Sequence, residues 1–91
     1  AEAERIGLVN KVVPHDELME ATREFAAEIA QNPPIAVGLA KATLYRGMIE
    51  DDLGSQEDYE SYIQNALMAT EDFQEGIAAF FEKREPIFKG K

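Results

Sequence analysis

The sequence predicts an all-α fold of about four helices, and three observations lead to this fold class. Apolar residues recur at helical spacing in four separate stretches of the chain. Proline, glycine or paired acidic residues separate these stretches, so the joints between the helices are short. The one strand-like run, Leu8–Val13, has no second run with which it could pair. A helical unit without a sheet therefore accounts for the whole pattern.

The length and charge of the chain limit what it can be. Its 91 residues make one small domain or a piece of a larger one, with a modest core. Nine basic against 18 acidic residues give a net charge of −9, which argues against nucleic acid or an anionic membrane as a partner of the whole surface. Cysteine is absent, so there is no disulfide framework, thiolate metal site or cysteine nucleophile. This composition is compatible with the cytosol, and we expect a cytoplasmic protein.

The first fourteen residues form a lead-in to the helical unit. Residues 1–6 are typical of the end of a helix that began earlier, and Gly7 is expected to end it in the left-handed conformation. The N-terminus has neither the basic region nor the apolar region of a signal peptide. We therefore expect residues 1–14 to be a helix end followed by a short extended linker that Pro14 closes, and residues 15–91 to form the helical domain. On this interpretation the chain is a fragment.

Two helices follow, separated by prolines. The first is expected from about Asp16 to Gln31 and the second from about Pro34 to Glu50, because Pro33 and Pro34 end one helix and suit the first turn of the next. The expected inward-facing residues are Leu18, Thr22, Phe25 and Ile29 in the first helix, and Ile35, Leu39, Ala42 and Ile49 in the second. Small residues (Ala36, Gly38 and Ala40) would let another element approach the second helix closely.

The third helix is expected from about Leu53 to Ala69, after a break at Asp51-Asp52 and Gly54. Its expected inward set is Tyr59, Ile63, Ala66 and Leu67. The chain has more apolar positions than one small bundle can cover. We therefore expect some helix faces to contact a partner.

The last twenty residues combine an apolar stripe with a cluster of cations. Asp72 is expected to cap the final helix, with Glu75 reaching back to the cap as in a capping box. Pro86 should end that helix near Arg84. The stripe consists of Phe73, Ile77, Phe80 and Phe81; the cations are Lys83, Arg84, Lys89 and Lys91. Such a cluster on an acidic chain can meet an anion.

The residues show no catalytic machinery of their own. His15 lies beside a helix start and is interpreted as a capping or solvated residue. Asp51-Asp52 is interpreted as a solvated helix junction, and Ser55 and Ser61 have no histidine nearby in sequence. The acidic residues of the third and fourth helices lack the spacing of a metal site, and no glycine-rich phosphate loop is present.

Several blocks of the sequence nevertheless resemble the C-terminal region of the crotonase family, the enoyl-CoA hydratases and isomerases. The matching residues are Gly7–Pro14 (GLVNKVVP), Glu17, Leu18, Ala30–Pro34, Lys41, Asp72, Glu75, Gly76, Ala79, Phe80, Glu82, Lys83, Arg84, Pro86, Phe88 and Gly90. The blocks cover nearly the whole chain in the order of the family, and the closing block is the most specific.

The resemblance implies a division of labour within a longer enzyme. In the family, an upstream core supplies two backbone N–H groups that stabilise a thioester enolate, and carboxylates that move the proton. None of those positions falls in this sequence. The resemblance therefore implies a parent enoyl-CoA hydratase/isomerase, a lyase of the fatty-acid β-oxidation type, whose fragment is inactive alone and has no catalytic residues.

The resemblance also implies partners and a binding site. The C-terminal region of the family is a helical trimerisation module, so the parent would be a homo-oligomer, a trimer or a dimer of trimers, with acyl-CoA as substrate, no tightly bound cofactor, no metal, and no nucleic acid or membrane as partner. Phe80 and Lys83 match family positions near the adenine and phosphates of coenzyme A, as an apolar wall and a point charge. The alternative is a core phenylalanine and a helix-end cation. Arg84 is assigned to an ion pair.

Other functions stay open at this point. Isomerases, decarboxylases and ring-forming or ring-opening enzymes of the naphthoyl-CoA synthase type share this region. A different class is a stand-alone, non-enzymatic helical interaction module. A metal- or phosphate-handling enzyme is a weaker third alternative, because the ligands are missing.

Overall fold

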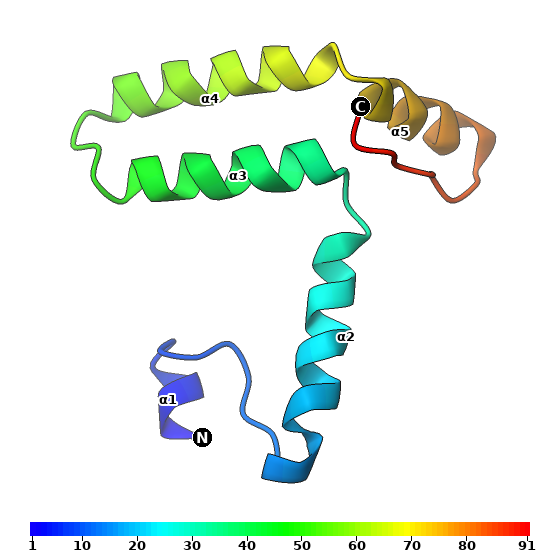
Figure 1. The fold of residues 1–91 in the computed structure, drawn as a ribbon. Helices are drawn as coiled ribbons and strands as arrows, with labels where there is room; N and C mark the ends of the chain where they lie inside the picture. The colour runs from blue at the N-terminus through cyan, green and yellow to red at the C-terminus, as the bar shows by residue number, and fades with distance from the viewer.

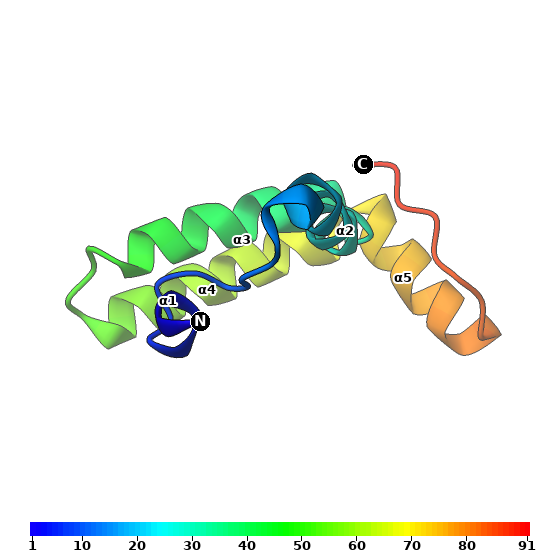
Figure 2. The same cartoon turned by 90° about the horizontal axis from the view of Figure 1, so that it is seen from below.

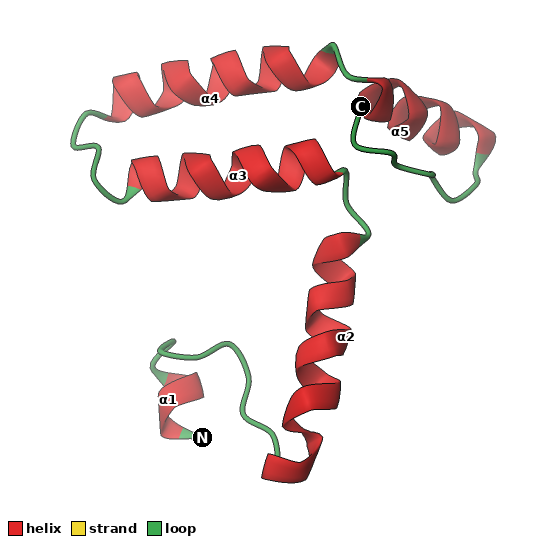
Figure 3. Ribbon diagram, viewed as in Figure 1, coloured by secondary structure: helices red, strands yellow, loops and turns green.

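The computed structural model describes all 91 residues, and it is entirely helical (Figures 1 and 3). It confirms the all-α fold class, since no strand forms. The elements are α1 (Glu2–Arg5), a 3-10 turn (His15–Glu17), α2 (Leu18–Ala30), α3 (Pro34–Gly47), α4 (Leu53–Met68) and α5 (Glu71–Glu82). None of these helices is long and apolar enough to cross a membrane.

The helices form an open array instead of a closed bundle. Helices α3 and α4 lie antiparallel and contact each other, whereas α2 projects away from them (Figure 1). Helix α5 follows α4 after a sharp bend, and the C-terminal tail returns along α5. Seen from below, the array is shallow (Figure 2), and its principal extents are 43 × 40 × 19 Å.

The openness is measurable. A compact protein of 10.1 kDa exposes about 5,300 Å², whereas this chain exposes 7565 Å². Its radius of gyration is 16.9 Å, against about 12 Å for a compact domain of this length. Only Ala79 and Asp72 are buried. The prediction of a modest core, made from the length, is therefore wrong for the chain by itself, because the helices do not close around one another.

The expected inward faces are covered only where α3 meets α4. Ile35 and Leu39 are half-buried opposite that helix, but Ala42 and Ile49 are exposed. In α2, the residues Leu18, Phe25 and Ile29 remain close to half exposed. The helical periodicity thus identified apolar stripes, but most of them stay uncovered within this chain.

Polar contacts join α3 to α4 next to the loop between them. The guanidinium of Arg46 lies 4.7 Å from the centre of the Tyr59 ring and donates to Glu50 at 2.9 Å. Asp52 caps α4 by accepting from the backbone N–H of Ser55 at 2.7 Å. The Arg46 guanidinium also donates to the Ser55 hydroxyl of α4 at 3.1 Å, so polar contacts join the antiparallel pair at its loop end.

Most expected helix boundaries are close to the observed ones. Gly7 adopts a φ of 75°, which confirms the left-handed residue expected after α1. Helix α3 ends at Gly47, three residues before the expected end at Glu50. The final helix begins one residue before Asp72 and ends at Glu82, two residues before Arg84.

The expected capping box at Asp72 is wrong. Thr70 is the N-cap of α5, and its hydroxyl accepts from the backbone N–H of Phe73 at 3.1 Å. Asp72 lies inside the first turn, where its carboxylate is available for contacts outside the helix. Glu75 likewise turns away from the cap.

Candidate functional site

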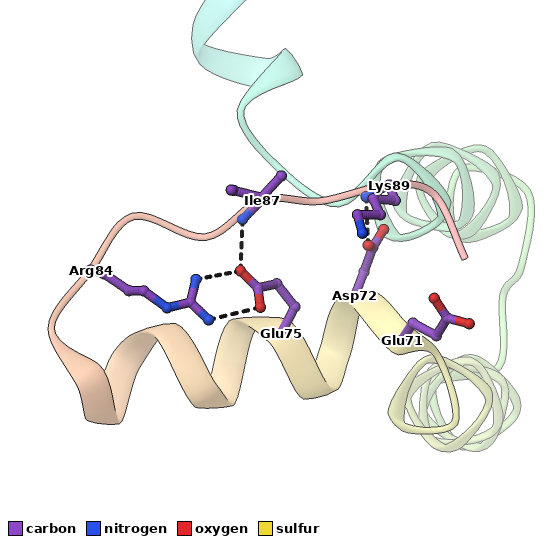
Figure 4. A pocket seen from close by; sticks show the side chains of 6 residues that line it. All are labelled: Glu71, Asp72, Glu75, Arg84, Ile87 and Lys89. Atoms are coloured by element: carbon purple, nitrogen blue, oxygen red, sulfur yellow. Dashed lines mark hydrogen bonds and ion pairs between the residues drawn. The ribbon is translucent and has the colours of Figure 1, made fainter.

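The C-terminal tail folds back over α5, and two carboxylates of that helix hold it there (Figure 4). Asp72 accepts from the backbone N–H of Lys89 and of Gly90, each at 2.7 Å. Its own backbone N–H donates to the carbonyl of Lys91 at 3.0 Å. Asp72 is 2% exposed, so its charge is compensated by these donors and not by water.

One turn further along α5, Glu75 forms the second attachment. Its carboxylate accepts hydrogen bonds from both terminal nitrogens of Arg84, at 2.6 and 2.9 Å, and from the backbone N–H of Ile87 at 2.9 Å. The Arg84 guanidinium, and next the Ile87 N–H, lower the pKa of Glu75 to about 2. Glu75 raises the pKa of Arg84 in turn, with a further contribution from Glu82. This contact confirms the ion pair predicted for Arg84.

Lys83 makes the turn between the helix and the tail. Its φ of 55° and ψ of 43° are left-handed, a conformation that glycine adopts more easily than lysine. The backbone N–H of Arg84 donates to the carbonyl of Ala79 at 3.1 Å, which is the Schellman pattern of a helix end. Lys83 is the one non-glycine residue of the chain with a positive φ. Such residues concentrate at functional sites.

Two aromatic rings stand exposed next to this turn. Phe80 is 78% and Phe81 is 77% exposed, and their rings meet edge to face with centres 5.7 Å apart. Lys83 is exposed as well and forms no ion pair within the chain. The end of α5 therefore presents apolar ring surface and an unpaired cation to the surroundings.

The structure divides the predicted cation cluster. Arg84 is used in the ion pair with Glu75, and the backbone of Lys89 is bound by Asp72. A cleft of about 550 Å³ lies between α5 and the tail. It is lined by Glu71, Asp72, Glu75, Arg84, Ile87 and Lys89 (Figure 4). The Arg84 guanidinium is paired at this cleft, whereas the ammonium groups of Lys83, Lys89 and Lys91 form no ion pair within the chain.

Sequence reasoning did not find the role of Asp72 and Glu75. The usable signal was their spacing, since residues three apart lie on one face of a helix. A tail turned back by Pro86 would pass over that face. The reasoning instead assigned both carboxylates to the helix start.

Comparison with known proteins identifies the family. Residues 1–91 match the family of enoyl-CoA hydratases and isomerases. The chain is 44% identical to a short-chain-enoyl-CoA hydratase of Clostridium acetobutylicum, over 92% of its own length and 32% of the relative's. It is 43% identical to a mitochondrial Delta(3,5)-Delta(2,4)-dienoyl-CoA isomerase of Dictyostelium discoideum, over 96% of its length and 30% of the relative's.

The fold agrees with this assignment. The crystal structure of an enoyl-CoA hydratase from Bacillus anthracis superposes with a TM-score of 0.91 and 42% identity, over 99% of this chain and 34% of the other. The chain belongs to the enoyl-CoA hydratase/isomerase family. It spans about a third of the length of the relatives that it matches.

Proposed function

We propose that the chain is the C-terminal helical region of an acyl-CoA enzyme of this family, in which it supports oligomerisation and covers the coenzyme A site. The observation that carries the proposal is the uncovered surface: the chain exposes 7565 Å², which is about 2,300 Å² more than a compact protein of its mass. An excess of that size matches the area that permanent protein interfaces bury. A cytoplasmic homo-oligomer, a trimer or a dimer of trimers, belongs to the same proposal.

The exposed residues have the character of an interface. Large apolar side chains are exposed on every long helix, among them Met19, Phe25, Tyr45, Tyr62 and Phe81. Aromatic residues and methionine are the types enriched where proteins associate. A catalytic core and neighbouring copies of the same protein would supply the missing cover.

The coenzyme A contact is assigned to Lys83 and Phe80. The ammonium of Lys83 supplies a point charge for a phosphate. Phe80 supplies an exposed ring as an apolar wall or stacking surface for adenine. A left-handed lysine supports this assignment, because glycine would occupy the same turn with less strain. Acyl-CoA is then the substrate of the whole protein, whose proposed reaction is hydration or isomerisation of an enoyl-CoA.

Substitution at Lys83 separates binding from folding. Lys83→Gly should stabilise the turn by about 1 kcal/mol while removing the cation, and Lys83→Ala should remove the cation with the strain kept. Both substitutions are made in the longer protein, in which this chain is joined to a catalytic core. We expect each variant to bind coenzyme A about 10- to 30-fold more weakly. Isothermal titration with coenzyme A measures this affinity, and thermal melting measures stability. Unchanged affinity in both variants would contradict the contact.

The oligomerisation role has its own test. A version of the longer protein that lacks residues 15–91 should lose the assembled mass in light scattering and the hydration of a short-chain 2-enoyl-CoA. The 91-residue chain alone should show no hydration. An assembly and activity that survive the deletion would overturn the proposal.

The second candidate is a stand-alone helical interaction module, favoured by the absence of catalytic residues in the sequence. The exposed helix faces fit this role as well. A reading frame that joins the chain to an enolate-stabilising core would exclude it. Decarboxylation and ring formation or opening are alternatives within the family, and the upstream carboxylates would distinguish them.

A further inference from the structure

We propose that Glu75 and Arg84 are positioning residues for the anion contact of Lys83: their ion pair fixes the direction in which the chain leaves α5 and so aims the Lys83 ammonium. This inference rests on the proposed coenzyme A contact and adds residues that do not themselves touch the ligand. It follows from where the attachments of the tail lie relative to the turn.

Lys83 lies between two fixed points. The residue before it, Glu82, ends α5, and the residue after it, Arg84, is bound to that helix by its side chain. The Arg84 guanidinium contacts Glu75 through both terminal nitrogens and Glu82 through Nε at 2.5 Å. A fork bound at three nitrogens has one orientation. The backbone of Lys83 is thereby held at both ends.

The attachment continues along the tail. Glu75 also accepts from the backbone N–H of Ile87 at 2.9 Å, three residues beyond Arg84. A left-handed conformation of a non-glycine residue persists when its surroundings determine it. Here the surroundings are the helix end on one side and the Glu75 carboxylate on the other.

The pair also sets the charge around the turn. Arg84 neutralises Glu75, so that no unpaired carboxylate from that position faces an incoming phosphate. Glu75 and Glu82 also occupy the Arg84 guanidinium, so that at the turn itself the cation without an ion pair is Lys83. The pair thus leaves Lys83 as the unpaired cation of the turn and holds the backbone that follows it.

The test uses the double variant Glu75→Gln/Arg84→Gln, which breaks the ion pair without changing the net charge. The matched control is Arg23→Gln/Glu24→Gln, an equal change on the exposed surface of α2. Both are made in the protein that joins this chain to its catalytic core. Each is assayed with an enoyl-CoA and with the corresponding enoyl-pantetheine, which lacks the phosphates and the adenine. Melting curves check that the variants fold.

We expect the double variant to raise the KM for the enoyl-CoA about 3- to 30-fold. The kcat, the KM for the enoyl-pantetheine and both constants of the control should change less than about twofold. Lys83→Gln should give a rise of the same kind. The triple variant Glu75→Gln/Lys83→Gln/Arg84→Gln should raise the KM for the enoyl-CoA no more than Lys83→Gln alone. The reason is that a residue that acts through another has no effect once the other is gone.

The outcomes separate the two claims. If Lys83→Gln changes the KM for both substrates equally or for neither, the coenzyme A contact itself is wrong. If Lys83→Gln acts on the enoyl-CoA alone, but the double variant has no effect, affects both substrates, or adds fully to Lys83→Gln, only the positioning role is overturned. Should the double variant not fold, Arg84→Lys keeps the charge and loses the fork. A rise of KM specific to the enoyl-CoA then supports the positioning role, and an unchanged KM overturns it.

Discussion

Replacing Asp72 by asparagine tests how the C-terminal tail is held. The wild-type carboxylate accepts two backbone N–H groups, from Lys89 and Gly90, one on each oxygen. Asparagine has nearly the same shape but only one acceptor oxygen, and its NH₂ group is a donor. One tail N–H then faces another donor, and the remaining bond loses its charge.

The magnitude follows from those two contacts. A hydrogen bond to a charged group contributes about 1.5–3 kcal/mol, and the substitution removes one such bond from a carboxylate that is 2% exposed. We expect the local opening of the tail to become easier by about that amount, which speeds amide exchange about 10- to 150-fold.

Hydrogen exchange followed by NMR reads the effect residue by residue. The amides of Lys89 and Gly90 should exchange faster in Asp72→Asn, with a smaller change at Ile87, which Glu75 holds. The control is Glu71→Gln, because Glu71 lines the same cleft and forms no hydrogen bond to the tail (Figure 4). Equal exchange rates at Lys89 and Gly90 in wild type and Asp72→Asn would refute the attachment.

Three further predictions concern the same chain. The pKa of Glu75 is lowered from its ordinary 4.5 to about 2, so its contribution to stability is full above about pH 4.5 and is lost as the pH falls through about 2. An NMR titration of the Ile87 amide should show that low midpoint, and a midpoint near 4.5 would contradict the ion pair. Gly76→Ala should raise the free energy of unfolding by up to about 1 kcal/mol, since the added Cβ would lie 3.7 Å from the Phe88 ring, an ordinary contact; a lower melting temperature would mean that the tail packs more tightly. The Cβ added by Gly38→Ala would have no atom within 4 Å, so this substitution should stabilise the isolated chain by about 1 kcal/mol. Melting curves of the chain and of the assembled protein would show whether a partner packs against this face and cancels the gain.

The sequence predicted the helices well because their signals are local. Apolar spacing, Pro33 and Pro34, and the glycine after α1 act within a few residues, and each has its expected effect in the structure. Thr70 was missed as the cap of α5 because Asp72 was an equally good candidate on residue type alone. The choice between two possible capping residues depends on the other contacts that each one makes. Here Asp72 binds the backbone of the tail, and Thr70 caps the helix.

The candidate site was predictable in composition but not in arrangement. A cluster of cations near Phe80 was visible in the sequence, yet nothing in the spacing showed which of these cations would be paired within the chain. That choice depends on contacts between residues nine and more positions apart, such as Glu75 with Arg84 and Asp72 with Gly90. Such contacts arise only once the tail has turned back.

Two kinds of interaction operate in this chain, and they have different consequences. The tail is held to α5 by charged hydrogen bonds between residues of the same chain. The apolar faces of α2 and α4 are uncovered in this chain. The orientation of Lys83 on α5 is therefore set within the chain, whereas the place of α5 over a catalytic core would be set by association. Under the proposed function, substitutions in the tail should change binding of the nucleotide part of the substrate, and substitutions on the apolar faces should change assembly.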